Sequence, residues 1–204
     1  MAGVKRIAGR AVALDRRDID TDQIIPASWL KRVERTGFAA GLFGAWRQDP
    51  EFVLNQPGAD AAKVLVAGSN FGCGSSREHA VWALQDFGFR AVVAPSFGDI
   101  FRNNSVAAGL VPARASEESV ARLFAALAAD PEAQIEVDVD ARTVAVPAAG
   151  LSEPFELADY ARWRLLEGLD DVGLTLRHEA AITAYEGTRP AWLPTLAANA
   201  PAGS

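Results

Sequence analysis

Short apolar runs alternate with helix-patterned segments through the middle of the chain. The run KVLVAG at 63–68 is apolar at consecutive positions after its lysine, which is typical of a strand buried on both faces. Apolar residues then recur at helical spacing over 76–87, and Gly88 follows as a natural helix-ending residue. The alternation continues as a strand at 91–94, a helix at 97–108, a strand at 110–113 and a helix at 116–130. Strands that take turns with helices predict an α/β sheet as the fold class.

The flanking segments add further strands. Residues 4–14 are rich in β-favouring side chains and predict a strand, whereas 23–38 favours a loop with a short helix. Two more apolar runs, 134–139 and 142–147, are separated only by Asp140 and Ala141. This spacing predicts an antiparallel hairpin.

After the hairpin, the pattern predicts two helices, with Pro154 in the first turn of one and Gly187 ending the other. The last residues are rich in alanine and proline, a composition typical of a frayed chain end. We find no internal repeat and no linker that divides the chain. We therefore expect one α/β domain over 1–187, including the C-terminal helices, and a flexible tail over 188–204.

Composition restricts the function classes. The chain has 204 residues, half of them apolar, so it is long enough to bury a substantial core. Its 20 basic and 26 acidic residues give a formal charge of −6, the wrong sign for a protein that clamps nucleic acid. A single cysteine cannot form an internal disulfide, which favours a reducing cytoplasmic location. The first 16 residues do not resemble a secretory signal, and no apolar run predicts a membrane span.

The segment GSNFGCGSSREHA, residues 68–80, is the strongest candidate for a binding site. Here the predicted buried strand is followed by a loop with three glycines, and the predicted helix begins after this loop. Gly72 and Gly74 allow positive φ and a close approach of the backbone to a ligand. Because a helix start also presents unpaired N–H donors, the loop is suited to a carboxylate or a phosphate.

Two familiar glycine motifs do not fit this loop. A P-loop needs a lysine before its Ser or Thr, but Gly74 precedes Ser75. A dinucleotide fingerprint needs a third glycine three places after Gly74, and that position is Arg77. A guanidinium fork beside a helix start favours a small organic carboxylate as the ligand.

Each of these residues also has a structural interpretation. Ser75 and Glu78 match the spacing of a helix capping box, so capping and acid/base chemistry are both open for Ser75. Arg77 could be an exposed helix charge. We expect His79 to be a satisfied, partly buried histidine and Cys73 a small apolar residue in a tight turn. A reactive Cys73 is the alternative, because a helix N-terminus lowers a thiol pKa.

The loop and its helix, GSNFGCGSSREHAVWAL, resemble the signature of the aconitase swivelling-domain family, and within it the small subunits of isopropylmalate dehydratases. Three further segments, DIDTDQIIPASWLKRVERTGFAAGLF, FGDIFRNNSVAAGLVP and LLEGLDDVGLTLRHEAAITAYE, resemble that family in the same order. The resemblance therefore extends over nearly the whole chain. It implies an aconitase-type swivelling β/β/α domain, a mixed sheet with flanking helices.

The resemblance also implies an activity, the dehydration of 2-isopropylmalate and its rehydration to 3-isopropylmalate in leucine biosynthesis. By the family pattern, Ser75 is the catalytic base, and Arg77 stabilises its anion and holds a substrate carboxylate. Gly74 contributes loop amides, and Ser76 matches a second substrate-contacting hydroxyl. Asp22 matches an acidic active-site position, with a turn-capping aspartate as its structural alternative.

Substrate discrimination in this family resides in the segment that corresponds to 26–34. Trp29 and Leu30 would offer apolar contact to an isopropyl group, whereas Lys31 could reach an acidic substituent. The family removes the substrate hydroxyl with a 4Fe-4S cluster held by three cysteines, and one cysteine cannot supply that ligand set. The resemblance therefore implies no cofactor and no metal on this chain, and a large iron–sulfur subunit as its partner.

Two rival functions are open from the sequence. The chain could serve a related hydro-lyase, of the homoaconitase or methylmalate type, with a different small dicarboxylate or tricarboxylate as its substrate. It could also be a non-catalytic anion-binding module. Only the catalytic functions require the Ser75 hydroxyl for turnover.

Overall fold

The computed structural model describes residues 3–31, 36–75, 77–190 and 192. The chain divides into two compact units, Met1–Asp170 and Asp171–Ser204, which are described separately. The division that the sequence predicts, a domain over 1–187 and a tail over 188–204, stays a prediction, because most of that tail lies outside the described residues.

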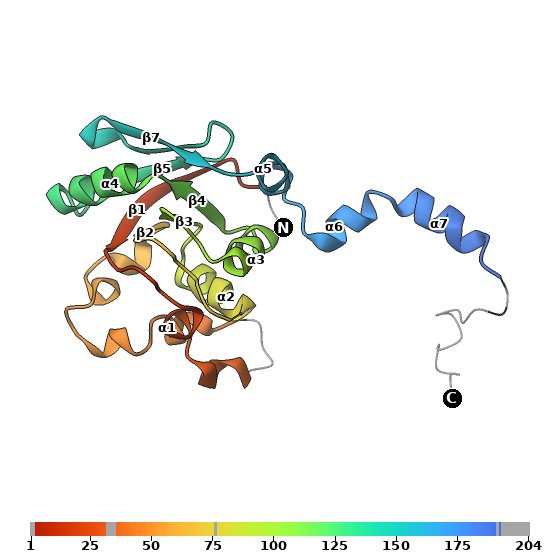
Figure 1. The fold of residues 1–204 in the computed structure, drawn as a ribbon, viewed down its shortest axis with the longest axis horizontal. Coiled ribbons are helices and arrows are strands. Elements are labelled where there is room, and N and C mark those ends of the chain that lie inside the picture. Colours follow the sequence, from red (N-terminus) through yellow and green to blue (C-terminus); the bar gives the residue numbers. More distant parts are fainter. Residues whose placement is uncertain (1–2, 32–35, 76, 191, 193–204) are drawn as a thin grey trace. The chain divides into compact units, whose positions relative to one another are not determined.

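Four parallel strands form one half of the first unit (Figure 1). They are β1 Arg6–Leu14, β2 Val64–Ala67, β3 Ala91–Ala94 and β4 Val111–Ala115. They pair in chain order, with Val12 opposite Leu65 and Leu65 opposite Val92. The sequence prediction for these strands is confirmed, and β3 has the expected limits.

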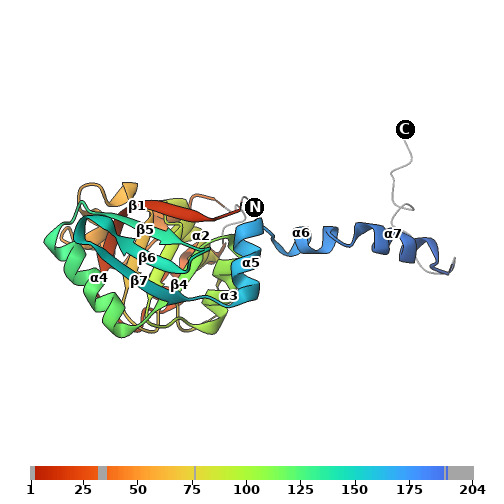
Figure 2. The ribbon, with the colours of Figure 1, turned by 90° about the horizontal axis from the view of Figure 1, so that it is seen from above.

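Three antiparallel strands form the other half, and Figure 2 shows them beside β1. They are β5 Gln134–Asp138, β6 Thr143–Val146 and β7 Leu151–Glu156. Because β7 pairs with β4 and β5 pairs with β1, the mixed sheet closes into a barrel in the order β1-β2-β3-β4-β7-β6-β5. The predicted hairpin is confirmed as β5 and β6.

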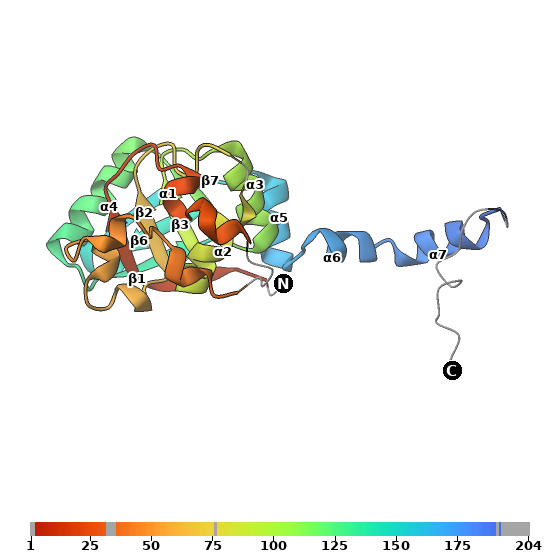
Figure 3. The ribbon, with the colours of Figure 1, turned by 90° about the horizontal axis from the view of Figure 1, so that it is seen from below.

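Helices flank the strands of the first unit. They are α1 Thr21–Ile24, α2 Glu78–Phe87, α3 Asp99–Ala108, α4 Glu117–Ala129 and α5 Asp159–Glu167. Short 3₁₀ helices lie at Ala27–Lys31, Phe38–Gly41, Trp46–Gln48, Val53–Asn55, Ala59–Ala61 and Pro147–Ala149. Figure 3 shows α1 and several of the short helices on the side of the unit where α2 lies.

The second unit contains two short helices, α6 Asp171–Leu176 and α7 Glu179–Gly187. Gly187 ends α7 as the sequence predicts. None of the side chains described in α6 or α7 is buried. No helix in the described part of the chain is long and apolar enough to cross a membrane.

Strands β2 and β3 are buried at every residue, as the continuous apolar run of β2 predicts. Alternate residues of β2 enter two different apolar clusters, Leu65 and Ala67 on one face and Val64 and Val66 on the other. The first cluster includes residues of α2 and the 3₁₀ segments, and the second includes residues of α4 and the antiparallel strands. The strands that carry the glycine loop are therefore fixed from both sides.

The prediction that Pro154 begins a helix is wrong. Pro154 lies in β7, opposite Thr143 of β6, and three helices, rather than two, follow this strand in the described residues. Glu153 and Phe155 of β7 are buried, whereas Pro154 between them is exposed. This alternation has the period of a strand, and it outweighs the helix-start signal of one proline.

A buried carboxylate, paired with a partly exposed arginine, joins α4 to β7. Glu153 is only 6% exposed and accepts two hydrogen bonds from Arg122, each of 2.7 Å, and one of 2.7 Å from Ser119. The bond from Arg122, with that from Ser119 second, lowers the pKa of Glu153 below its ordinary value. Ser116 caps α4 at the same place by accepting from the Ser119 amide at 3.0 Å.

We predict that Arg122→Met lowers the melting temperature at neutral pH. The difference in melting temperature between this variant and the natural chain should become smaller at acid pH. A carboxyl whose pKa is lowered on folding contributes stability above its unfolded pKa of about 4.3, and this contribution is lost as the pH falls through the lowered value. Without Arg122, ionised Glu153 is buried and unpaired until acid protonates it. Thermal melts between pH 3 and 8 check this.

Arg102→Met is the matched control, because Arg102 pairs with exposed Asp99 and should change the melting temperature little. An equal deficit of the Arg122 variant at acid and neutral pH would contradict the role of Glu153 ionisation.

Candidate active site

Three loops meet at the carboxyl ends of β1, β2 and β3. They are residues 15–20, 68–77 and 95–98, each following one parallel strand. Isolated bridges pair Asp20 with Cys73 and Phe71 with Phe97. Carboxyl ends of adjacent parallel strands meet at one edge, the usual location of ligand sites in such sheets.

Glycines allow the middle loop to pass close to its neighbours. Gly72 has φ of 71°, and a Cβ placed on it would lie 2.3 Å from the Phe101 ring of α3. Gly74 has φ of 91°. The expected positive φ at both glycines is confirmed, and at Gly72 a larger residue would also displace an aromatic side chain.

The helix after the loop starts later than the sequence predicts. The predicted helix covered 76–87, but α2 begins at Glu78, with Arg77 as an N-cap in extended conformation and no side-chain cap. Ser75 therefore lies two residues before the N-cap, and the structural alternative that makes it a helix cap is wrong. Ser75 is exposed to solvent.

Arg77 connects Ser75 with Asp22. Its Nε donates to Ser75 Oγ at 3.1 Å, and its two terminal nitrogens pair with the two carboxylate oxygens of Asp22, Nη2 with Oδ2 at 2.9 Å. The Arg77 side chain is 15% exposed, compared with 56% for Asp22. Arg77 is therefore not an exposed helix charge. Its pairing with the Asp22 carboxylate fixes the direction in which Arg77 Nε donates to Ser75.

Asp22 is free to pair with Arg77 because another residue caps α1. Asp20 is the N-cap, accepting from the Gln23 amide at 2.8 Å, while Gln23 Oε1 accepts from the Asp20 amide at 2.9 Å. The capping role that was the structural alternative for Asp22 is therefore performed by Asp20. Sequence analysis missed Asp20, although its spacing to Gln23 is that of a capping box.

Two backbone N–H groups of the glycine loop, at and next to Ser75, are available to a ligand. Gly74 and Ser75 are exposed, and among the described residues their N–H groups have no hydrogen-bond acceptor. Unpaired amides next to a guanidinium are suited to an anion. Ser76, the other predicted substrate contact in this loop, lies outside the described residues.

The predicted discrimination segment, residues 26–34, is described only as far as Lys31, and this part includes the 3₁₀ helix Ala27–Lys31; residues 32–34 lie outside the described residues. Trp29 is half-buried and packs against Phe38 with ring centroids 6.3 Å apart, Leu30 is half-buried, and Lys31 is exposed. Phe38 in turn contacts His79 of α2 at 5.4 Å. Trp29 thus has a packing role. The predicted partial burial of His79 is confirmed, whereas hydrogen bonding of its ring nitrogens stays a prediction.

Cys73 does not have the environment of a reactive thiolate. Burial, followed by the negative charges of Asp20 and Asp18, raises the pKa of the Cys73 thiol above its ordinary value. No group of three or more His, Cys, Asp or Glu side chains in the described residues could hold a metal ion.

We predict that Cys73 reacts slowly with iodoacetamide at pH 7 and that its rate rises steeply only above pH about 8.5, the ordinary thiol pKa. Asp18→Asn removes one of the charges that disfavour the thiolate and should speed alkylation at a given pH. Mass spectrometry of the intact chain measures both rates, and Cys73→Ser is the unlabelled control because the chain has one cysteine. Alkylation at pH 7 as fast as that of a free cysteine would contradict the protonated state.

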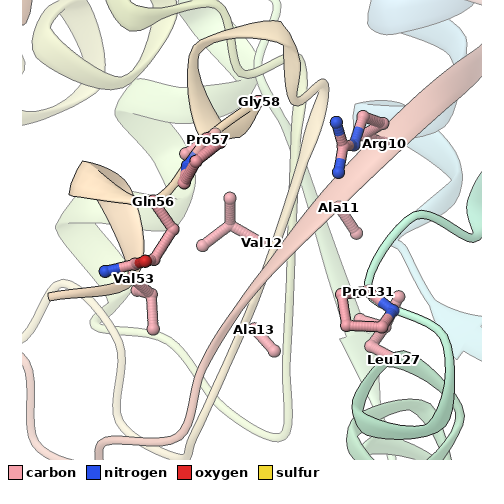
Figure 4. A pocket seen from close by; sticks show the side chains of 11 residues that line it. Arg10, Ala11, Val12, Ala13, Val53, Gln56, Pro57, Gly58, Leu127 and Pro131 are labelled. Atoms are coloured by element: carbon pink, nitrogen blue, oxygen red, sulfur yellow. The ribbon is translucent and has the colours of Figure 1, made fainter. Parts of the chain in front are cut away.

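A separate cavity of about 210 Å³ lies between β1, residues 53–59 and α4 (Figure 4). Its charged lining side chain, Arg10, pairs with Glu132 at 3.2 Å. None of the predicted site residues that the structure describes lines this cavity. The three-loop edge, with its fixed guanidinium and exposed hydroxyl, is therefore the candidate active site.

Comparison with known proteins identifies the family. Residues 1–118 match the aconitase C-terminal domain, and residues 171–199 match the C-terminal domain of the 3-isopropylmalate dehydratase small subunit. The chain is 62% identical over 189 residues to a 3-isopropylmalate dehydratase small subunit of Frankia casuarinae, covering 93% of this chain and 96% of the relative. It is 55% identical over 194 residues to the protein of that name from Rubrobacter xylanophilus, covering 95% and 98%.

A solved structure has the same fold. The crystal structure of 3-isopropylmalate dehydratase from Methanocaldococcus jannaschii aligns with a TM-score of 0.67 and 29% identity, covering 89% of this chain and 99% of the other. The match includes the mixed sheet and its flanking helices, so the predicted fold class is confirmed. The chain belongs to the family of 3-isopropylmalate dehydratase small subunits.

Proposed function

We propose that this small subunit carries the proton-transfer half of a 3-isopropylmalate dehydratase, with Ser75 as the base that takes a proton from substrate carbon. The observation that carries the proposal is the 3.1 Å hydrogen bond from Arg77 Nε to Ser75 Oγ at an exposed loop. The reaction dehydrates 2-isopropylmalate and rehydrates the unsaturated diacid at the neighbouring carbon, a step of leucine biosynthesis.

A serine hydroxyl needs help to act as a base. A cation that donates a hydrogen bond favours the alkoxide over the neutral hydroxyl. Arg77 supplies this donor through Nε, while Asp22 accepts one hydrogen bond from each terminal nitrogen and leaves a second N–H on each of them. Asp22 offsets part of the positive charge, so its contribution is to orient the guanidinium. Lysine could not replace Arg77, since a single ammonium lacks the planar fork that binds both partners.

The same loop is proposed to hold the substrate carboxylates. The Gly74 and Ser75 amides are available as donors, and the family pattern adds the Ser76 hydroxyl and Arg77. Trp29 and Leu30 are half-buried and offer apolar surface for the isopropyl group, with exposed Lys31 at the end of their helix. This combination suits a dicarboxylate with a branched apolar substituent.

The proposed partner is a large subunit that holds a 4Fe-4S cluster. The residues of this chain do not fit such a cluster, because cluster ligation needs at least three thiolates and this chain has only Cys73. When bound to the partner, the cluster would act as the Lewis acid for the substrate hydroxyl. This chain's own contribution is the base, its orientation and carboxylate binding. We propose the cytoplasm as the compartment.

Ser75→Ala should lower kcat of the complex reconstituted with the large subunit by about 10²- to 10⁴-fold, because it removes the proton acceptor. The melting temperature should change little, since Ser75 is exposed and caps no helix. Steady-state isomerase assays and thermal melts measure the two effects. Ser152→Ala, at an exposed serine of β7, is the matched control.

Near-normal turnover by Ser75→Ala would support the second candidate function, a non-catalytic anion-binding module, for which the unpaired Gly74 and Ser75 amides are the favouring observation.

Substrate preference tests the other half of the proposal. The reconstituted complex should prefer 2-isopropylmalate over a methyl-substituted malate by on the order of 10-fold or more in kcat/KM, the range expected for lost apolar contact. Leu30→Ala should reduce this ratio by lowering kcat/KM for the isopropyl substrate more than for the methyl one. A preference for homoaconitate would instead assign the chain to a tricarboxylate hydro-lyase.

A further inference from the structure

A short parallel ladder continues from β1 and β2 into the candidate site. The Ile19 carbonyl accepts from the amides of Gly72 and Cys73 at 2.7 and 3.2 Å. The amide of Thr21 then donates to the Cys73 carbonyl at 2.9 Å. Segment 19–21 therefore fixes the glycine loop by backbone hydrogen bonds up to Cys73, two residues before Ser75.

The backbone ladder cannot continue to Ser75, because the chain turns into α1. The next amide in register, that of Gln23, donates to the N-cap Asp20 at 2.8 Å and is no longer available to the loop. The Thr21 side chain takes this place: its Oγ1 donates to the Ser75 carbonyl at 2.9 Å. Thr21 is 2% exposed and Ser75 is exposed, so the bond is buried on its donor side.

Thr21 and Asp22 contact the two ends of the Ser75–Arg77 pair. Thr21 bonds the backbone of Ser75, and Asp22 pairs with the guanidinium of Arg77. Gly74, next to Ser75, lies against the same helix start, with a built Cβ only 3.7 Å from Thr21 Oγ1. The Ser75 carbonyl is thereby oriented from α1.

We propose that Thr21 is a positioning residue for catalysis, whose buried hydroxyl holds the Ser75 carbonyl so that Ser75 Oγ stays within reach of Arg77 Nε. This inference rests on the proposed function of Ser75. A Ser75 peptide that lost this bond would be anchored only through Cys73, and Gly74 would allow it to rotate. A displacement of about 1 Å at a catalytic group can cost on the order of 10²-fold in rate.

Thr21→Val tests the inference in the complex reconstituted with the large subunit, because valine keeps the shape and removes the hydroxyl. We expect kcat to fall about 10- to 100-fold with a much smaller change in KM. The pH dependence of kcat should also move, with its rise displaced to higher pH, since Arg77 then stabilises the alkoxide less well. A purely structural role for Thr21 would not move this profile.

Thr21→Ser retains the hydroxyl and should keep kcat within a few-fold of the natural chain. Ser105→Ala is the matched control, because Ser105 is also a buried hydroxyl that donates to a backbone carbonyl, that of Phe101 at 2.8 Å. This control should leave kcat unchanged even if it lowers the melting temperature.

Normal kcat in Thr21→Val, or a loss in Thr21→Ser as large as in Thr21→Val, would overturn the positioning role. If Thr21→Val does not fold, the serine variant decides, since the inference requires it to be active. The two proposals fail separately. Full activity of Ser75→Ala would contradict the proposed role of Ser75 as the base. An inactive Ser75→Ala together with a normal Thr21→Val would contradict only the inference about Thr21.

Discussion

Parallel pairing of β1 with β2 is the constraint on which the candidate site depends. This pairing brings the segment after Leu14 next to the segment after Ala67, although about fifty residues separate them in the chain. Asp22 and Ser75 come together for this reason, and the bridge between Asp20 and Cys73 continues the strand register into the loops. An antiparallel pair would place these two loops at opposite edges of the sheet, where no side chain could connect them.

The two halves of the barrel have different roles. The parallel half ends in the segments that carry Asp22, Ser75 and Arg77, whereas the antiparallel half closes the barrel and covers one apolar cluster. Glu153 and Arg122 join α4 to the closing strand β7, with Ser119 completing the network. Closure removes the free strand edges, so the loops extend from a barrel in which every strand is hydrogen-bonded to a neighbour on both sides.

The sequence predicts the parallel half well because its signals are local. A continuous apolar run and a helical repeat each indicate one element, and β3 and α4 appear where expected. The glycine loop at 68–80 also predicts that Ser75 and Arg77 are site residues. The start of α2 could not be predicted, since it depends on Arg77 being drawn out of the helix toward Asp22, a residue far away in sequence. Barrel closure and the strand at Pro154 depend likewise on pairing between distant segments.

The geometry of Arg77 suits a site that is completed by a second chain. Asp22 and Ser75 hold the guanidinium in place within this chain, so its orientation does not have to be created when a partner binds. Ser75 nevertheless faces solvent, and Asp22 is more than half exposed. Water at this edge screens the interaction of the guanidinium with an alkoxide. A partner surface that covered the edge would remove this screening without moving Arg77, and the alkoxide form of Ser75 would then be most stable in the assembled enzyme, where substrate is present.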